Sequence, residues 1–217
     1  MSELTVRIAT LAGSCFAYAG RRDRAANNIY MNVYDFDKTI MDTDSSGLFL
    51  VYCLKKMPRI FLKGIGGKAS SLFAWLSGKE TVDRFKENMF SFLKYVPDPE
   101  ALIETFWDEN MSHVEPYYKE LHRSDDVVIS ASPDFLVRPA AERLDVSLIA
   151  TDMSVSSGLI RGLNCKGQEK VRRFRECYPD AHVEAFYSDS LSDTPMAELA
   201  DAAYLIVDHK PEPWPEK

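Results

Sequence analysis

Two aspartates separated by one residue follow a short apolar segment near the start of the chain. Residues 31–34 are typical of a β-strand, and the run Asp35-Phe36-Asp37-Lys38-Thr39 comes directly after them. Side chains alternate between the two faces of a strand, so Asp35 and Asp37 are expected to project into one crevice. Carboxylates held so close repel each other unless a divalent cation neutralises them or one is protonated, and both conditions suit phosphoryl transfer. Taken alone, the motif is equally compatible with a solvated turn.

Three further polar clusters follow along the chain. A Ser-Ala-Ser-Pro run at residues 130–133 ends a strand pattern, Lys166 precedes a helical pattern, and Asp189 and Asp193 follow another apolar segment. Each cluster is a weak signal alone, and their order along the chain is the informative feature. Together with the first motif, the four segments resemble the haloacid dehalogenase superfamily, and within it the phosphoserine-phosphatase-like branch, from about residue 31 to residue 208.

The resemblance implies an α/β fold, with a Rossmann-like doubly wound parallel sheet and a helical cap inserted after the first core strand. It also implies a hydrolase that uses Mg²⁺ and an aspartyl-phosphate intermediate to cleave a small phosphorylated metabolite. The residue pattern agrees with this fold. Strand and helix patterns alternate from residue 127 to residue 207, which predicts a mostly parallel sheet with ligands at the carboxyl ends of its strands.

The intervening region has a helical pattern. Apolar residues at positions 82, 85, 89, 92 and 93 share one helix face, and further helices are predicted at 99–110 and 114–121. We therefore expect a catalytic core made of residues 31–45 and 124–217, with a helical cap at residues 46–123. Residues 1–30 fit the family poorly and are expected to lie outside the catalytic fold.

The resemblance also implies roles for individual residues. Asp35 matches the nucleophile, and Asp37 matches the acid that protonates the leaving alcohol and then activates water. The Ser130 hydroxyl and the Ala131 amide are expected to bind phosphoryl oxygens, with Ser132 as the nearby alternative. Lys166 is expected to pair with Asp35 and phosphate, although Lys170, one helical turn further on, competes for this role. The expected Mg²⁺ ligands are Asp35, Asp37, Asp189 and Asp193, where Asp193 either ligates the ion directly or orients it through water.

The substrate is less well defined by the sequence. Asp44 stands where phosphoserine phosphatases carry a Glu that helps to bind the amino acid, and this departure argues against phosphoserine itself. Arg84 and Lys86 are cap cations for a substrate carboxylate or a second phosphate, unless they only form a solvated helix face. Basic and apolar residues interleave between residues 55 and 76, a pattern suited either to an anionic membrane surface and a lipid phosphate or to helix packing within the cap.

Composition narrows the classes of protein. The 217 residues are 46% hydrophobic and 27% charged, as in an ordinary globular protein. A net charge of −7 argues against a general nucleic-acid binder. The four cysteines show no C-x-x-C spacing, so neither a zinc site nor a disulfide framework is predicted, and buried thiols in the cytoplasm are expected. A phosphotransferase remains the alternative enzyme, and a receiver-like signalling domain is the alternative without turnover, although such domains lack a residue like Asp37 and a cap.

Overall fold

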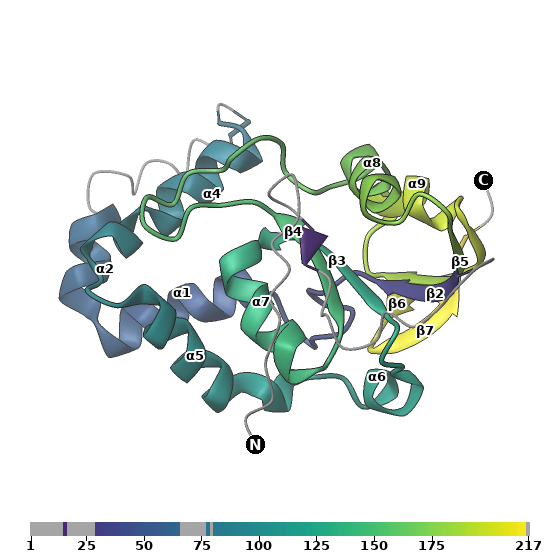
Figure 1. Ribbon diagram of the computed structural model, residues 1–217. Coiled ribbons are helices and arrows are strands. Elements are labelled where there is room, and N and C mark those ends of the chain that lie inside the picture. Colours follow the sequence, from purple (N-terminus) through teal and green to yellow (C-terminus); the bar gives the residue numbers. More distant parts are fainter. Residues whose placement is uncertain (1–14, 17–28, 66–76, 79, 216–217) are drawn as a thin grey trace, which may run out of the picture.

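The computed structural model describes residues 15–16, 29–65, 77–78 and 80–215 of the chain (Figure 1). Within them, seven strands form one sheet in the order β1-β4-β3-β2-β5-β6-β7. The five central strands run parallel, while β1 and β7 pair antiparallel at the two edges. The predicted doubly wound parallel sheet is therefore confirmed. The strands are β1 (Cys15–Phe16), β2 (Ile29–Tyr34), β3 (Val127–Pro133), β4 (Ser147–Thr151), β5 (Ala181–Ser188), β6 (Ala200–Val207) and β7 (Lys210–Pro213).

Helices cover both faces of this sheet, because the central strands are apolar on both sides. In β2, Val33 points into a cluster with Phe174 of helix α8 and Met196 of helix α9. The next residue, Tyr34, points to the opposite face and joins a cluster with Tyr118 of helix α6 and Leu136 of helix α7. The covering helices are α6 (Pro116–Leu121), α7 (Asp134–Arg143), α8 (Gln168–Cys177) and α9 (Thr194–Ala197).

A group of helices inserted after β2 stands beside the sheet (Figure 1). It has an aromatic core in which the Phe49 ring lies against the rings of Phe90, Phe92 and Phe106. Local capping sets the helix starts, since Asp98 accepts a hydrogen bond from the Ala101 amide and a proline follows it. The inserted elements are α1 (Ser45–Lys56), α2 (Pro58–Ile65), α4 (Val82–Phe90), the 3₁₀ helix η1 (Ser91–Tyr95) and α5 (Pro99–Asn110).

The two chain segments that join this cap to the core pair with each other. The Glu115 amide donates to the Ile40 carbonyl over 2.8 Å, beside a β-bridge between Met41 and Val114. Helix α6 follows this crossing and packs on the core sheet, where the Tyr118 ring meets Tyr34 at 4.9 Å between centroids. The predicted cap, residues 46–123, is therefore too long at its end. A helical pattern reveals an apolar face and does not say which neighbour covers that face.

Two other expectations need correction. Strand β2 begins at Ile29, and Cys15–Phe16 pair with β4, so the prediction that residues 1–30 lie outside the catalytic fold fails at these positions. The remaining residues up to 28 lie outside the described part of the chain. The expectation of free thiols holds for Cys53 and Cys165, which are buried, but Cys177 is disulfide-bonded. None of the described helices is long and apolar enough to cross a membrane.

Candidate active site

Most of the predicted site residues gather in one pocket where the parallel strands end. The pocket has a volume of about 280 Å³, and the core lines it through the segments that follow β2 and β5, the end of β3 and the residues around the start of α8. The inserted helices contribute Ser46, Val82 and Lys86 to the lining of the same pocket. The core residues that line it include Asp35, Asp37, Lys38, Ala131, Ser132, Lys166, Lys170, Asp189 and Asp193.

Asp35 lies at the end of central strand β2, where its backbone amide donates to the Tyr187 carbonyl over 2.8 Å. Its carboxylate is 2.9 Å from the Lys170 ammonium, which also lies 2.7 Å from Asp193. Burial raises the pKa of Asp35, and the charge of Lys170 opposes that rise. Burial acts to lower the pKa of Lys170, but the two carboxylates outweigh it and the pKa is raised. Lys170 is therefore a permanent buried cation beside Asp35.

The pairing expected for Lys166 belongs to Lys170. Gly167 has φ +56° at the start of α8, and this turn directs Lys170, in the first turn of the helix, into the pocket. Lys166 precedes the turn, lies exposed at the pocket rim and makes no ion pair with a described carboxylate. The sequence signal that favours Lys170 is its place in the first turn of a helix after a glycine, and locating that helix start required the backbone.

Asp37 is held by two donors. The Ser45 amide donates to one carboxylate oxygen over 2.7 Å, and the Ser132 hydroxyl donates to the other over 2.5 Å. Burial and then the charge of Asp44 raise the pKa of Asp37 to about 6, despite these hydrogen bonds. A carboxyl group with such a pKa can be protonated near neutral pH, as a general acid requires.

Ser132 lines the pocket, whereas Ser130 does not. The expectation that the Ser130 hydroxyl faces the pocket is therefore wrong. The Ser130 hydroxyl is buried and accepts a hydrogen bond from the Ser132 amide over 3.0 Å, so it supports the loop from behind. Strand β3 continues to Pro133 with a register shift after Ser130, so the strand ends three residues later than the predicted end at Ser130. Ala131 lines the pocket, and phosphate binding by its amide stays a prediction.

The four predicted metal ligands are not brought together as one cluster. Among the described residues, no three His, Cys, Asp or Glu side chains are arranged around a common point. The Asp193 carboxylate accepts hydrogen bonds from the Lys170 ammonium and, over 3.0 Å, from the Ser188 hydroxyl. The Asp37 carboxylate accepts from the Ser45 amide and the Ser132 hydroxyl. Asp35 contacts Lys170 through only one carboxylate oxygen, and the Asp189 carboxylate makes no hydrogen bond within the described part of the chain, so these two retain capacity for a cation.

The chemistry of this remaining pair fits a magnesium ion. Burial and then the nearby charge of Asp35 raise the pKa of Asp189 to about 6, as expected for two carboxylates that face each other. Mg²⁺ commonly binds through one or two carboxylates and completes its shell with waters and substrate phosphate. Two acidic ligands beside a phosphate pocket therefore satisfy its needs.

The two cap cations fall on different sides of α4. Arg84 lines a separate cavity of about 530 Å³ between α4 and residues 156–159, and its side chain is 77% exposed. Lys86 enters the catalytic pocket, because positions two apart on a helix differ by about 200° in direction. The expectation for Arg84 is therefore wrong in its placement. Asp44 lines the pocket, where its carboxylate caps α1 by accepting from the Gly47 amide at 2.8 Å.

Comparisons with known proteins agree with this geometry. The model of the haloacid dehalogenase-like hydrolase family matches residues 33–198. Protein CicA of Caulobacter vibrioides is 29% identical over 200 residues, which cover 82% of this chain and 86% of that protein. A probable phosphatase of Mycobacterium tuberculosis is 37% identical over 91 residues, which cover 38% of this chain and 31% of that protein.

Two solved structures share the fold. A Bordetella pertussis protein of unknown function has a TM-score of 0.67 at 17% identity, over 82% of this chain and 90% of that one. A phosphoserine phosphohydrolase-like protein from Francisella tularensis has a TM-score of 0.53 at 18% identity, over 83% of this chain and 88% of that one. At such identities the likeness shows the fold alone.

Proposed function

The chain belongs to the haloacid dehalogenase-like hydrolase family, and from this premise we propose that it hydrolyses phosphate monoesters through an aspartyl-phosphate on Asp35. The observation that supports this proposal is the shared pocket of Asp35 and Asp37, in which each carboxyl has a different partner. Asp35 is paired with the cation of Lys170, which suits a nucleophile. Asp37 is held by neutral donors and has a raised pKa, which suits an acid.

The reaction uses these two carboxyls in turn. A carboxylate oxygen of Asp35 attacks phosphorus, the bond from phosphorus to the leaving oxygen breaks, and Asp37 gives its proton to that oxygen. Asp37, now ionised, then takes a proton from the water that attacks the aspartyl-phosphate. This second step releases inorganic phosphate and restores both residues. Lys170 stays hydrogen-bonded to Asp35 and Asp193 and compensates negative charge during both steps.

Asp35 and Asp189 are the residues that would hold Mg²⁺. When bound, the ion supplies positive charge that offsets the repulsion between these carboxylates and a dianionic phosphate. The cap side chains Ser46, Val82 and Lys86 line the pocket beside these carboxylates.

Phosphate release from a generic aryl phosphate tests this function. We expect many phosphates per protein molecule with Mg²⁺, loss of activity with a chelator, and no activity in Asp35→Asn, whose amide cannot attack phosphorus. A single equivalent of product would instead favour a receiver-like domain. Transfer of the phosphoryl group to an added alcohol, without release of phosphate, would favour a phosphotransferase. Full activity in Asp35→Asn would refute the proposed mechanism.

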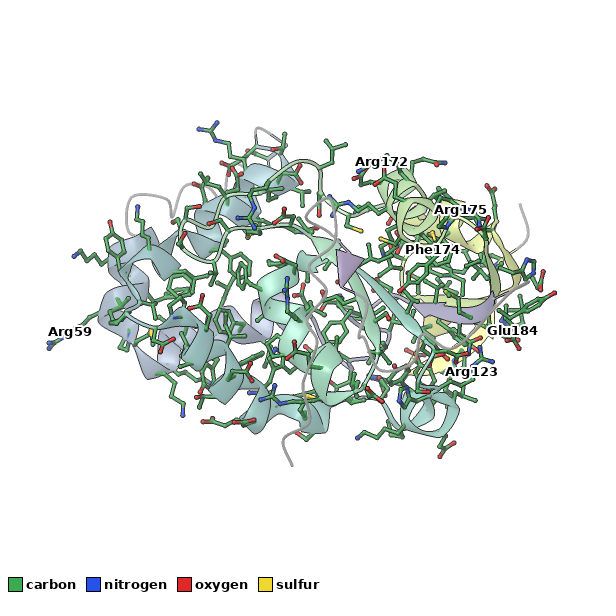
Figure 2. The ribbon with its side chains drawn as sticks, in the orientation of Figure 1. Arg59, Arg123, Arg172, Phe174, Arg175 and Glu184 are labelled. Atoms are coloured by element: carbon green, nitrogen blue, oxygen red, sulfur yellow. The ribbon has the colours of Figure 1, made fainter. Side chains whose placement is uncertain are left out.

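A lipid phosphate is the second candidate substrate, and the outer surface of the cap favours it. On α1 and α2, Val51 and Leu62 are 48% and 55% exposed, next to the exposed cations Lys55 and Arg59. Figure 2 shows Arg59 extending outward from α2, at the end of the molecule away from the sheet. Residues 66–76 of the interleaved segment lie outside the described residues.

Vesicle binding distinguishes the two substrate classes. If the cap meets a membrane, the protein should bind vesicles with acidic lipid in low salt, and each basic residue near the surface should contribute about 1 kcal/mol. Lys55→Glu and Arg59→Glu should weaken binding, whereas the matched reversal Lys119→Glu on α6 should not. Absence of binding in low salt would leave the soluble metabolite as the substrate.

A further inference from the structure

A core segment contacts helix α4 and thereby fixes the position of Lys86 in the catalytic pocket. This segment, residues 152–164, connects β4 to α8 and closes on itself through a bridge between Met153 and Ile160. The Glu87 carboxylate accepts a hydrogen bond from the Ile160 amide over 3.1 Å. Gly158, with φ +73°, lies so close to the Phe90 backbone that an added Cβ would come within 2.8 Å of it. These contacts fix α4, and with it Lys86, relative to the core.

The Lys86 ammonium has two neutral acceptors. Its Nζ donates to the Ala131 carbonyl over 2.9 Å and to the Asn164 side-chain oxygen over 3.3 Å. The Thr151 hydroxyl lies within hydrogen-bond distance of both acceptors, 2.8 Å from the Ala131 carbonyl and 2.9 Å from the Asn164 side-chain oxygen. An ammonium has three N–H donors, and within the described residues neither a third acceptor nor an ion-paired carboxylate takes the last one. Lys86 is thus a half-buried cation that can donate one further hydrogen bond to a ligand in the pocket.

Lys86 lines the same pocket as Asp37, the residue proposed to protonate the leaving oxygen. Its Nζ is hydrogen-bonded to the Ala131 carbonyl and the Asn164 side chain, and among the neighbouring charges that of Asp37 has the largest effect on the pKa of Lys86. Lys166 lies on the same side and adds a second positive charge. The volume of about 280 Å³ leaves room for a phosphoryl group and a short leaving group.

We propose that Lys86 selects substrates whose leaving group carries a second anionic group, a carboxylate or a phosphate, and that Asn164 positions the lysine for this task. This inference rests on the proposed function and names its substrate class. The anion would take the third N–H of Lys86 and form a charge-assisted hydrogen bond.

Three substrates whose leaving alcohols share a three-carbon chain and differ in the terminal group test the inference: propyl phosphate, 3-(phosphonooxy)propanoate and propane-1,3-diyl bisphosphate. We expect kcat/KM to be at least about tenfold higher for the two anionic compounds than for propyl phosphate, since tenfold corresponds to about 1.4 kcal/mol. In Lys86→Met this ratio should fall towards one, mainly through KM. Lys86→Arg should keep part of it.

The matched control is Arg84→Met, which removes a cation from the same helix but from outside the catalytic pocket. Its selectivity ratio should equal that of the unchanged protein. Asn164→Ala should lower the ratio without abolishing turnover of propyl phosphate, as expected for a positioning residue.

Affinity provides a readout that does not need turnover. On the Asp35→Asn background, calorimetry should again favour the anionic compounds, and Lys86→Met should remove the preference. Equal affinities with and without Lys86, or equal losses on all three substrates, would overturn the inference. An affinity preference for anions without turnover in the unchanged protein would instead contradict the proposed function and leave the recognition by Lys86 standing.

Discussion

At the scale of single residues, Lys170 has the largest expected effect on both folding and activity. It is 1% exposed and pairs with two carboxylates, so Lys170→Met would leave Asp35 and Asp193 buried without their cation. Breaking such a buried pair costs about 3–5 kcal/mol. We expect a large fall in melting temperature and no detectable turnover. Lys166→Met should melt normally, because Lys166 lies exposed at the rim, and a comparable destabilisation in that variant would contradict the assignment.

The acid role of Asp37 is a second prediction at this scale. Asp37→Asn cannot donate a proton to the leaving oxygen, and an alkoxide needs this proton far more than a nitrophenolate does. Turnover of an alkyl phosphate should therefore fall by about 10²–10⁴-fold, whereas nitrophenyl phosphate should lose much less. Steady-state rates on the two substrates measure this difference. Equal losses would argue that Asp37 only shapes the pocket.

At the scale of elements, the segment that joins β4 to α8 fixes the cap. Gly158→Val would put a branched side chain at φ +73° and against the Phe90 backbone, so the segment must move away from α4. Strain and overpacking of this kind cost about 1–3 kcal/mol, and each kcal/mol lowers the melting temperature by about 2–4 °C in a chain of this size. Thermal unfolding measures the loss. Gly162→Val is the matched control, because Gly162 also has a positive φ but has open space around it.

The same substitution should affect the reaction through Lys86. If the segment releases α4, Lys86 loses its fixed position, and the preference for anionic leaving groups should fall while hydrolysis of propyl phosphate persists. Unchanged selectivity in Gly158→Val would mean that the cap is held by other contacts, such as the bond of 2.6 Å from the Trp107 indole to the Leu136 carbonyl.

At the scale of the whole molecule, one buried carboxyl should make stability depend on pH. Asp126 is fully buried, and burial raises its pKa from 3.8 to about 6, which its hydrogen bond from the Arg123 amide only partly offsets. Between these values the folded protein binds more protons than the unfolded chain, so this group's contribution falls as pH rises from about 4 through 6. The loss is on the order of 3 kcal/mol, since each pKa unit corresponds to about 1.4 kcal/mol.

Asp126→Asn should remove the contribution of this group, while Asp37 and Asp189, whose pKa values are also raised to about 6, keep theirs. Melting temperatures from pH 4.5 to pH 7.5 should fall less steeply in the variant than in the unchanged protein, with Asp125→Asn, a partly exposed neighbour, as the control. A steeper fall in Asp126→Asn would show that the ionised carboxylate stabilises the fold.

Sequence reasoning reached the sheet and the general position of the site, because those depend on local patterns. Asp35 follows an apolar strand, and α5 spans Pro99–Asn110 as predicted, since prolines and Asp98 mark its start. Two choices depended on element boundaries to within two or three residues. The start of a helix decides between Lys166 and Lys170, and the end of a strand decides between Ser130 and Ser132. The role of Asn164 was missed, since a single loop asparagine carries no pattern of its own.

The covalent step on Asp35 can be measured directly. The protein is mixed in slight excess with a ³²P-labelled phosphate monoester and Mg²⁺, quenched in acid within a single turnover, digested and sequenced by mass spectrometry. We expect transient label on the peptide that contains Asp35, with none in Asp35→Asn and a longer lifetime in Asp37→Asn, where water activation is lost. Label on another residue, or rapid phosphate release with no labelled protein at any time, would contradict the mechanism.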